Sequence, residues 1–257
     1  GESPLLKETK LYPIIQLMVI GLFILIAILL QRTHYRSSQN QLWASLAKET
    51  AHQLGTPVSS LEGWLEILKE HPENAGYVPE IAKDVQRLQL ITDRFGKIGS
   101  QPKLEATNLN QQIELIVQYM KKRAGGQVQF EYAVNELAPI QAQISPPLFD
   151  WVMENLLKNA LDAMDGKGMI SVALQATSHE IVIDVTDTGK GIASKHLKKV
   201  FKPGFTTKKR GWGLGLSLSK RIVEQYHKGK LFVRFSEPGK GTSFRIILPL
   251  APTDFLG

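Results

Sequence analysis

The first strongly patterned stretch of the chain is apolar on all sides. Residues 11–30 contain no charged side chain, and Gln16 is the only strongly polar one. At about 1.5 Å per residue, a helix of this length can cross a hydrocarbon layer of about 30 Å. A buried core helix is the alternative, but such helices seldom stay apolar all round for so long. The pattern therefore predicts one transmembrane helix over residues 11–30.

Two helical patterns follow residues 31–40, a short polar stretch that we expect to be a linker. The first runs from about Gln41 to Glu70 with apolar residues at near-heptad spacing, and the second runs from about Val78 to Gly99. His71-Pro72 and the following Asn-Ala-Gly predict a turn between them. The apolar stripes are Trp43, Leu46, Leu54, Leu61, Leu65 and Leu68, and then Ile81, Val85, Leu88, Phe95 and Ile98. Two such helices cannot form a stable core alone, so the pattern predicts a homodimer with a four-helix bundle.

The pattern changes after Gln101-Pro102 to alternating strands and helices. Two expected strands, Met169–Ala176 and Glu180–Val185, are joined by a tight turn, which predicts a mixed or antiparallel sheet of the α+β class. The other expected strands are 127–132, 140–144, 231–236 and 242–248, and the expected helices are 108–123, 146–164 and 214–226.

The amino-acid composition excludes several kinds of site and favours certain kinds of ligand. The 257 residues include no cysteine, which excludes disulfide scaffolds, thiolate zinc sites and cysteine nucleophiles. The net charge of +7 favours a phosphate-rich ligand, anionic lipid or nucleic acid as partner. Eight Lys or Arg and no Asp or Glu lie between Thr188 and Arg210, so the charge concentrates in one loop-like segment. This concentration weighs against direct nucleic-acid binding.

His52 is the candidate nucleophile. At about 100° per residue it lies opposite the apolar stripe of the first bundle helix, with Glu49 and Thr56 one turn to either side. A neutral imidazole exposed on a helix is available for covalent chemistry. An incidental surface histidine is the alternative.

Three further motifs indicate a ligand site. Asn155 and Asn159 stand one turn apart around Lys158, and carboxamide oxygens can help hold Mg²⁺; a structural coincidence is the alternative. Asp187 ends an expected strand, and Gly189, Gly191 and Ile192 follow it. Such a loop lets the backbone approach a ligand closely. An ordinary glycine turn, which has the same sequence pattern, is the alternative.

The last motif is cationic and rich in glycine. It runs through Phe201, Phe205, Thr206, Thr207 and Lys208 to a glycine cluster that opens a helix, which suits a polyphosphate. It lacks the strand that precedes a Rossmann fingerprint and contains no GxxxxGK[ST]. The residues of the cluster are Gly211, Trp212, Gly213, Leu214, Gly215 and Leu216.

In this order and spacing, the motifs closely resemble those of the sensor histidine kinases of two-component signalling. The resemblance covers about Gln41 to Leu250. Residues 51–57 look like the H-box, 155–160 like the N-box, 187–192 like the G1 box, 201–205 like the F-box and 211–216 like the G2 box.

The resemblance implies a dimerisation and histidine phosphotransfer domain over residues 41–100 and a Bergerat-type (GHKL) ATPase domain, an α/β sandwich, over residues 101–257. Asp187 would bind the adenine amino group, Asn159 with Asn155 would hold Mg²⁺, and Lys208 with the glycine backbone would contact the triphosphate. His52 would accept the phosphoryl group from ATP and pass it to an aspartate of a response regulator. The ATP contacts would come from Asn155, Lys158, Asn159, Asp187, Gly189, Gly191, Ile192, Phe205, Thr206, Thr207, Lys208, Gly211, Gly213, Leu214, Gly215 and Leu216.

ATP binding would place the catalytic domains in the cytoplasm. The helix over residues 11–30 would then anchor the chain in the bacterial inner membrane. Residues 1–10 would then be the extracytoplasmic end of an upstream region, since the chain begins at Gly1.

The chain departs from the family at Gln53, where the family usually has an acidic residue. We expect either that Glu49 replaces that base or that an oriented imidazole and the metal make a base less necessary. The alternative is a phosphatase-biased protein in which Gln53 and Thr56 orient a water. A Bergerat-fold ATPase of another kind is a further alternative, disfavoured by the apolar span and by His52.

Overall fold

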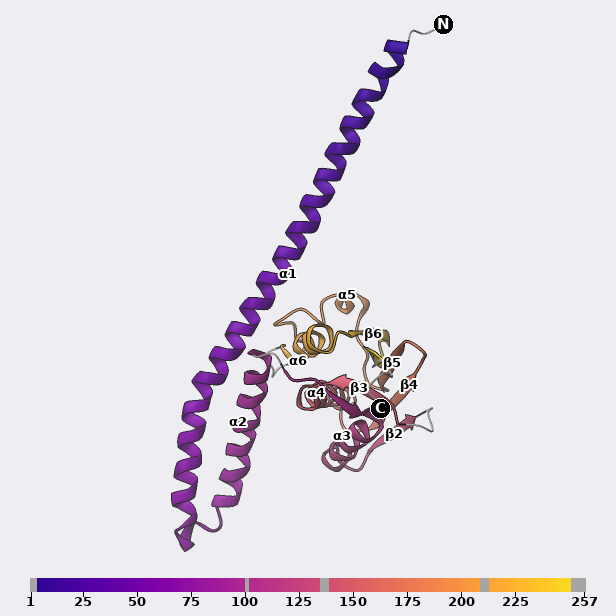
Figure 1. Ribbon diagram of the computed structural model, residues 1–257. Helices are drawn as coiled ribbons and strands as arrows, with labels where there is room; N and C mark the ends of the chain where they lie inside the picture. Colours follow the sequence, from indigo (N-terminus) through magenta and orange to yellow (C-terminus); the bar gives the residue numbers. More distant parts are fainter. Residues whose placement is uncertain (1–3, 100–101, 135–138, 209–212, 251–257) are drawn as a thin grey trace, which may run out of the picture. The chain divides into compact units, whose positions relative to one another are not determined.

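The computed structural model describes residues 4–99, 102–134, 139–208 and 213–250, and within these the side chains of residues 4–11, 14, 32–46, 72, 98 and 99 are not described. The chain divides into two compact units, Gly1–Ser100 and Gln101–Gly257 (Figure 1). The division falls where the sequence predicts the change from a helical hairpin to an α+β domain.

The first unit is a helical hairpin. Helix α1 spans Pro4–Lys69, a short 3₁₀ helix η1 spans Pro72–Asn74, and helix α2 spans Val78–Gly99. The predicted turn is therefore confirmed, but the polar stretch 31–40 is helical rather than a separate linker. The stretch contains no proline or glycine, so nothing in it stops a helix.

The predicted membrane span lies within α1. In the part of the chain that the structure describes, no helix combines the length and the hydrophobicity needed to cross a membrane. Leu11 and Ile14 belong to the predicted span, and their side chains lie outside the described residues. The span stays a prediction.

The two helices of the hairpin approach each other through small side chains. A Cβ added to Gly55 would lie 3.8 Å from Thr92 Cγ2, and one added to Gly96 would lie 3.7 Å from the Cβ of Ala51. The residues buried along this contact are Ala47, Val58 and Leu65 on α1 and Val78, Val85 and Thr92 on α2. Leu54 and Leu61, which the sequence pattern places in the same stripe, stay exposed beside it.

The second unit is built on a five-stranded sheet in the order β2-β4-β5-β7-β6. Strands β2 and β4 are parallel and the other pairs are antiparallel, which confirms the prediction of a mixed sheet. The strands are β2 (Val128–Val134), β4 (Gly168–Ala176), β5 (Glu180–Asp187), β6 (Lys230–Glu237) and β7 (Gly241–Pro249).

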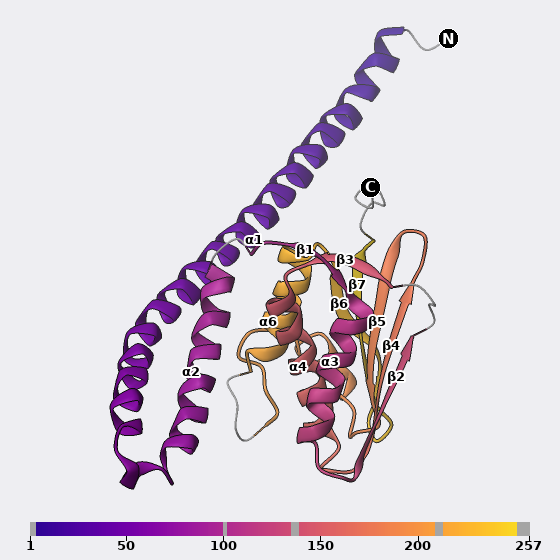
Figure 2. The same ribbon diagram turned by 60° about the horizontal axis from the view of Figure 1, so that its bottom comes forward.

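Helices cover one face of this sheet, as Figure 2 shows for α3, α4 and α6. The core between the layers is apolar and includes Phe149 of α4 and Ile170 of β4, both fully buried. The helices are α3 (Leu109–Arg123), α4 (Pro146–Ala163), the short α5 (Ser194–Leu197) and α6 (Gly215–Arg221), which continues into a π-helical turn η2 (Ile222–Tyr226). Two strands, β1 (Glu105–Asn108) and β3 (Gln141–Ile144), form a separate antiparallel pair. The sequence pattern did not predict β1 or α5, which are only four residues long each.

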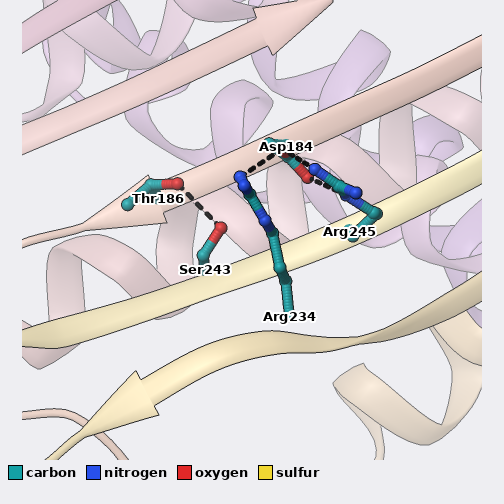
Figure 3. A network of polar contacts seen from close by, with 5 residues as sticks. All are labelled: Asp184, Thr186, Arg234, Ser243 and Arg245. Carbon is teal, nitrogen blue, oxygen red and sulfur yellow. Dashed lines mark hydrogen bonds and ion pairs between the residues drawn. The ribbon is translucent and has the colours of Figure 1, made fainter.

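The other face of the sheet carries a polar network that ties three strands together (Figure 3). Asp184 of β5 accepts hydrogen bonds from Arg245 of β7 at 2.7 and 2.6 Å and from Arg234 of β6 at 2.9 Å. This carboxylate raises the pKa of Arg245. Beside it the hydroxyls of Thr186 and Ser243 lie 2.9 Å apart. The network cross-links β5, β7 and β6 three residues before Asp187, at the end of β5.

Candidate functional site

Helix α4 is the element that joins the predicted motifs of the second unit. It begins with Pro146 at its first turn, where proline costs no hydrogen bond, and it ends at Ala163. Asn155, Asn159 and Asp162 follow one another along it at intervals of four and three residues, which keeps them near one face. From Asn155 to Ala163 the helix rises about 12 Å. Along that length it meets α6, the 201–208 loop and the loop after β5.

At the first of these contacts, Asn155 packs against the start of α6. Its Nδ2 donates a hydrogen bond to Ser219 Oγ at 2.9 Å. A Cβ added to Gly215 would lie 2.3 Å from Asn155 Oδ1, so a larger residue there would force the Asn155 side chain to move. Asn155 therefore positions α6, whereas Asn159 contacts other partners. The expected convergence of the two carboxamides on one point is not formed in the described contacts.

At the second contact, two oxygens of α4 hold a cation. Lys208 Nζ donates to Asn159 Oδ1 at 2.8 Å and to Asp162 Oδ2 at 2.6 Å. The lysine and aspartate side chains are 39% and 40% exposed. A carboxylate and a carboxamide are oxygen donors of the kind that Mg²⁺ prefers, and the ammonium shows that they can share one cation. These two oxygen donors therefore fit Mg²⁺.

The protein donors alone make a sparse metal site. No group of three or more His, Cys, Asp or Glu able to hold a metal occurs among the residues that the structure describes. Mg²⁺ keeps several waters and commonly shares its coordination with substrate phosphates. The site therefore suits a metal that arrives with a phosphate ligand.

At the third contact, Asp187 ends β5 as a buried carboxylate, 4% exposed. Its Oδ1 accepts the backbone N–H of Gly189 at 2.8 Å, and the backbone N–H of Thr242 also hydrogen-bonds to it. Burial raises the pKa of Asp187, and these two bonds oppose the rise. The result is a fixed acceptor for an N–H group of a ligand.

The loop after Asp187 is held from two sides. Lys190 N donates to the carbonyl of Ala163 at 2.9 Å, and Ile192 N donates to Ser236 Oγ at 2.7 Å. Gly191 has a φ of +70°, and a Cβ there would overlap the carbonyl of Glu237. The described contacts therefore explain the need for Gly191 by packing and leave its predicted ligand role untested.

Ring contacts anchor the 201–208 loop. The ring of Phe201 meets that of Phe244 edge to face at 6.2 Å and carries the ammonium of Lys220 at 4.7 Å. The Phe205 ring lies 5.3 Å from that of His196. The tip of the loop that carries Lys208 is thus attached to a fixed base.

The remaining predicted residues lie around this base. Gly204 N donates to Gly213 O at 3.1 Å, and Thr206 Oγ1 accepts from Lys208 N at 3.1 Å. The carbonyl of Leu214 accepts from Ser217 Oγ at 2.8 Å at the start of α6, where Leu216 is half-buried. Thr207 and Lys158 are exposed, and Gly211 and Trp212 lie outside the described residues.

The predicted phospho-acceptor lies on α1 in the first unit. His52 is exposed, as expected from its position about 180° around the helix from Leu61. Glu49, Gln53 and Thr56 are exposed beside it. Gln53 Nε2 donates to Glu49 Oε1 at 2.7 Å, so the residue directly after His52 is paired with the residue one turn before it.

The sequence analysis missed several residues that shape the site. Asp162 offered a signal, because it lies three residues after Asn159 on the same helix face. Three further residues take their positions from strand register and loop packing, which a local sequence pattern does not predict. They are Ser219, Ser236 and Thr242.

Comparison with known proteins gives the family. Residues 145–252 match the sequence family described as histidine kinase-, DNA gyrase B-, and HSP90-like ATPase. The chain is 33% identical over 229 residues to the sensor histidine kinase ZraS of Escherichia coli (strain K12), covering 86% of this chain and 49% of ZraS. The chain thus spans about half the length of this curated relative.

Two solved structures share the fold. Full-length ShkA in complex with AMPPNP has a TM-score of 0.64 at 21% identity, covering 81% of this chain and 46% of that one. Histidine kinase ThkA in complex with the response regulator TrrA has a TM-score of 0.56 at 21% identity, covering 86% of this chain and 66% of that one. The chain is homologous to the sensor histidine kinases, and its residues 145–252 belong to the histidine kinase-, DNA gyrase B-, and HSP90-like ATPases.

Proposed function

We propose that this chain is an ATP-dependent protein-histidine kinase that phosphorylates itself on His52. The observation that carries the proposal is the convergence on α4 of three motif segments, with a cation-holding oxygen pair and a buried carboxylate at two of its contacts. Homology to ZraS over most of the chain supports the same activity. AMPPNP in the ShkA complex supports an adenine nucleotide as the ligand.

The chemistry assigned to the residues is as follows. An imidazole nitrogen of His52 attacks the γ-phosphorus of ATP, the N–P bond forms, the bond to the β-phosphate oxygen breaks, and ADP leaves. Asp187 accepts an N–H of the adenine, and Lys208 with the backbone of residues 213–216 binds the phosphates. Asn159 would hold Mg²⁺, which would neutralise phosphate charge, while Asn155 positions α6. Such positioning and charge neutralisation are the main needs of phosphoryl transfer.

Glu49 is the proposed acceptor of the imidazole proton. It lies one helical turn before His52, and its carboxylate is held by the amide of Gln53. The second candidate function, a phosphatase-biased protein, would need the Gln53 amide to orient a water. One N–H of that amide donates to Glu49, while the amide has a second N–H and a carbonyl oxygen for such a water.

The partner for onward transfer is a response-regulator receiver domain, which would take the phosphoryl group on an aspartate. The ThkA structure contains such a regulator, TrrA. Exposure of His52 on α1 leaves the imidazole accessible to a second protein.

A homodimer is the proposed assembly, through an apolar flank of the hairpin. Leu54 and Leu61 are rotated from Val58 by roughly 40–60° around α1, and Ile81 and Leu88 are rotated from Val85 by the same amount and in the same sense around α2. Because the helices are antiparallel, both flanks lie on the same side of the hairpin. All four side chains are exposed, so a second copy of the hairpin would bury them in a four-helix bundle.

The proposed location is the bacterial inner membrane, with the bundle helices after the span and the second unit in the cytoplasm. Residues 15–31 of α1 are exposed throughout, and most of them are large and apolar. Contact with lipid would bury this surface.

The test is incubation of the chain with γ-labelled ATP and Mg²⁺, beside His52→Gln and Asn159→Ala. Acid-labile, alkali-stable label on the wild type that is lost in both variants is the expected result. Nucleotide binding without any label would favour the phosphatase-biased function instead.

A further inference from the structure

Lys208 and Asp162 form a contact that the assigned roles do not use. Lys208 has to reach the phosphates of a bound nucleotide, yet in this structure its ammonium lies 2.6 Å from Asp162 Oδ2 and 2.8 Å from Asn159 Oδ1. The lysine thus occupies the oxygens of α4 that fit a metal ion.

An ammonium and a hydrated Mg²⁺ cannot share these oxygens at the same time. Two cations a few ångströms apart repel each other, and the ammonium directs its N–H donors along the lone pairs that a metal or its waters would use. Binding of Mg²⁺ with the nucleotide must therefore displace Lys208. Since both side chains are about 40% exposed, their ion pair is weak enough to exchange readily.

Lys208 can be displaced with little movement of the rest of the 201–208 loop. The 201–208 loop is anchored behind it by the ring contacts of Phe201 and Phe205. Only the tip of the loop has to turn, while its base stays in place.

We propose that Asp162 is a cation-exchange residue. In the nucleotide-free protein it binds Lys208 and holds the loop tip against α4. When Mg²⁺ and nucleotide bind, Asp162 contacts the hydrated metal, and the released lysine binds the phosphates. This inference rests on the proposed function, and it couples the arrival of the metal to the placement of Lys208.

The test compares the wild type with Asp162→Asn, and with Asp165→Asn as the matched control. Asp165 lies three residues further along and is exposed, so its variant makes the same change of charge nearby. The first measurement is hydrogen exchange of residues 201–208 in the nucleotide-free chain. Asp162→Asn should speed exchange there, and Asp165→Asn should not.

The second measurement is the Mg²⁺ concentration at half-maximal binding of a fluorescent ATP analogue. Asp162→Asn should raise this midpoint severalfold, because the contact that it loses to a divalent ion outweighs the exposed ion pair that it loses with Lys208. Lys208→Met should lower it, because the competing ammonium is gone, although saturated nucleotide binding becomes weaker.

The outcomes separate the two proposals. Nucleotide binding with equal midpoints in the wild type and Asp162→Asn would overturn the exchange and leave the proposed kinase function intact. Unchanged exchange of residues 201–208 in Asp162→Asn would also overturn it. A wild type that binds no nucleotide at any Mg²⁺ concentration would overturn both proposals.

Discussion

The buried carboxylate of Asp187 costs the fold stability, and its proposed role is to bind a ligand. Burial raises its pKa, which means that the charged carboxylate is less favourable in the folded protein than in the unfolded chain. Its contribution to stability is present at low pH and is lost as the pH rises from about 3.8 through the raised pKa. At neutral pH the residue therefore lowers the free energy of unfolding.

Replacement of Asp187 by Asn should separate these two effects. The variant removes the buried charge and keeps the size, so the urea midpoint at pH 7 should stay the same or increase. Affinity for an adenine nucleotide should fall by roughly tenfold or more, since an amide cannot offer the same charged acceptor. Isothermal calorimetry measures the affinity. A variant that loses stability but keeps its affinity would contradict the assignment.

Glu49 is the second residue whose role can be isolated. If it takes the imidazole proton, Glu49→Gln should lower the initial rate of His52 phosphorylation by roughly 100-fold, with nucleotide affinity unchanged. Glu62→Gln is the matched control, because Glu62 is also exposed on α1. Equal rates in the two variants would show that solvent takes the proton.

At the scale of elements, α4 depends on a buried histidine beside its first turn. The backbone N–H of Ser145, the residue before α4, donates to His227 Nε2 at 3.1 Å. His227 follows η2 and is 2% exposed. Burial lowers its pKa from 6.5 to about 4, so the neutral ring is the form that the fold accepts. The start of α4 and the end of η2 are thereby tied together.

The stability of the second unit should follow this titration. The unfolded chain binds a proton near pH 6.5 and the folded protein only near pH 4, so the free energy of unfolding should fall as the pH drops through this window. The full loss is on the order of 3 kcal/mol. His227→Gln should flatten the slope in urea denaturation, whereas His179→Gln, at an exposed histidine, should leave it unchanged. A wild-type slope retained in His227→Gln would rule out this cause.

At the scale of the whole molecule, the hairpin has more apolar surface than its internal contact can cover. Its two helices meet through small residues such as Gly55 and Gly96, which keeps the internal contact narrow. The flank that contains Leu61 and Leu88 is left exposed. A bundle of two hairpins would bury this flank, as four-helix bundles do.

Charge on the flank should therefore prevent the proposed dimer from forming. Leu61→Glu is expected to convert the chain to a monomer. Each copy would otherwise bury an unpaired carboxylate in the apolar interface, which is unfavourable. Ser59→Glu, at an exposed position on the other flank of α1, should remain dimeric. Light scattering of the chain in detergent measures the mass. A dimer that survives Leu61→Glu would place the interface elsewhere.

The local features of this protein were determined by its sequence. Apolar periodicity predicted the hairpin, its turn and most strands and helices, because those signals depend on neighbours a few residues apart. The same holds for the exposure of His52 on α1. The glycine and asparagine motifs likewise indicated the position of the candidate site along the chain.

The contacts across the chain were decided only by tertiary structure. Asn155 turned out to support α6, Asp162 joined Asn159 around Lys208, and the hairpin packed through small residues. Each of these depends on which distant segment comes to lie against a helix face, and that is settled by the register of the sheet and the packing of the core. Periodicity along a helix says which side chains share a face, but not what that face will meet.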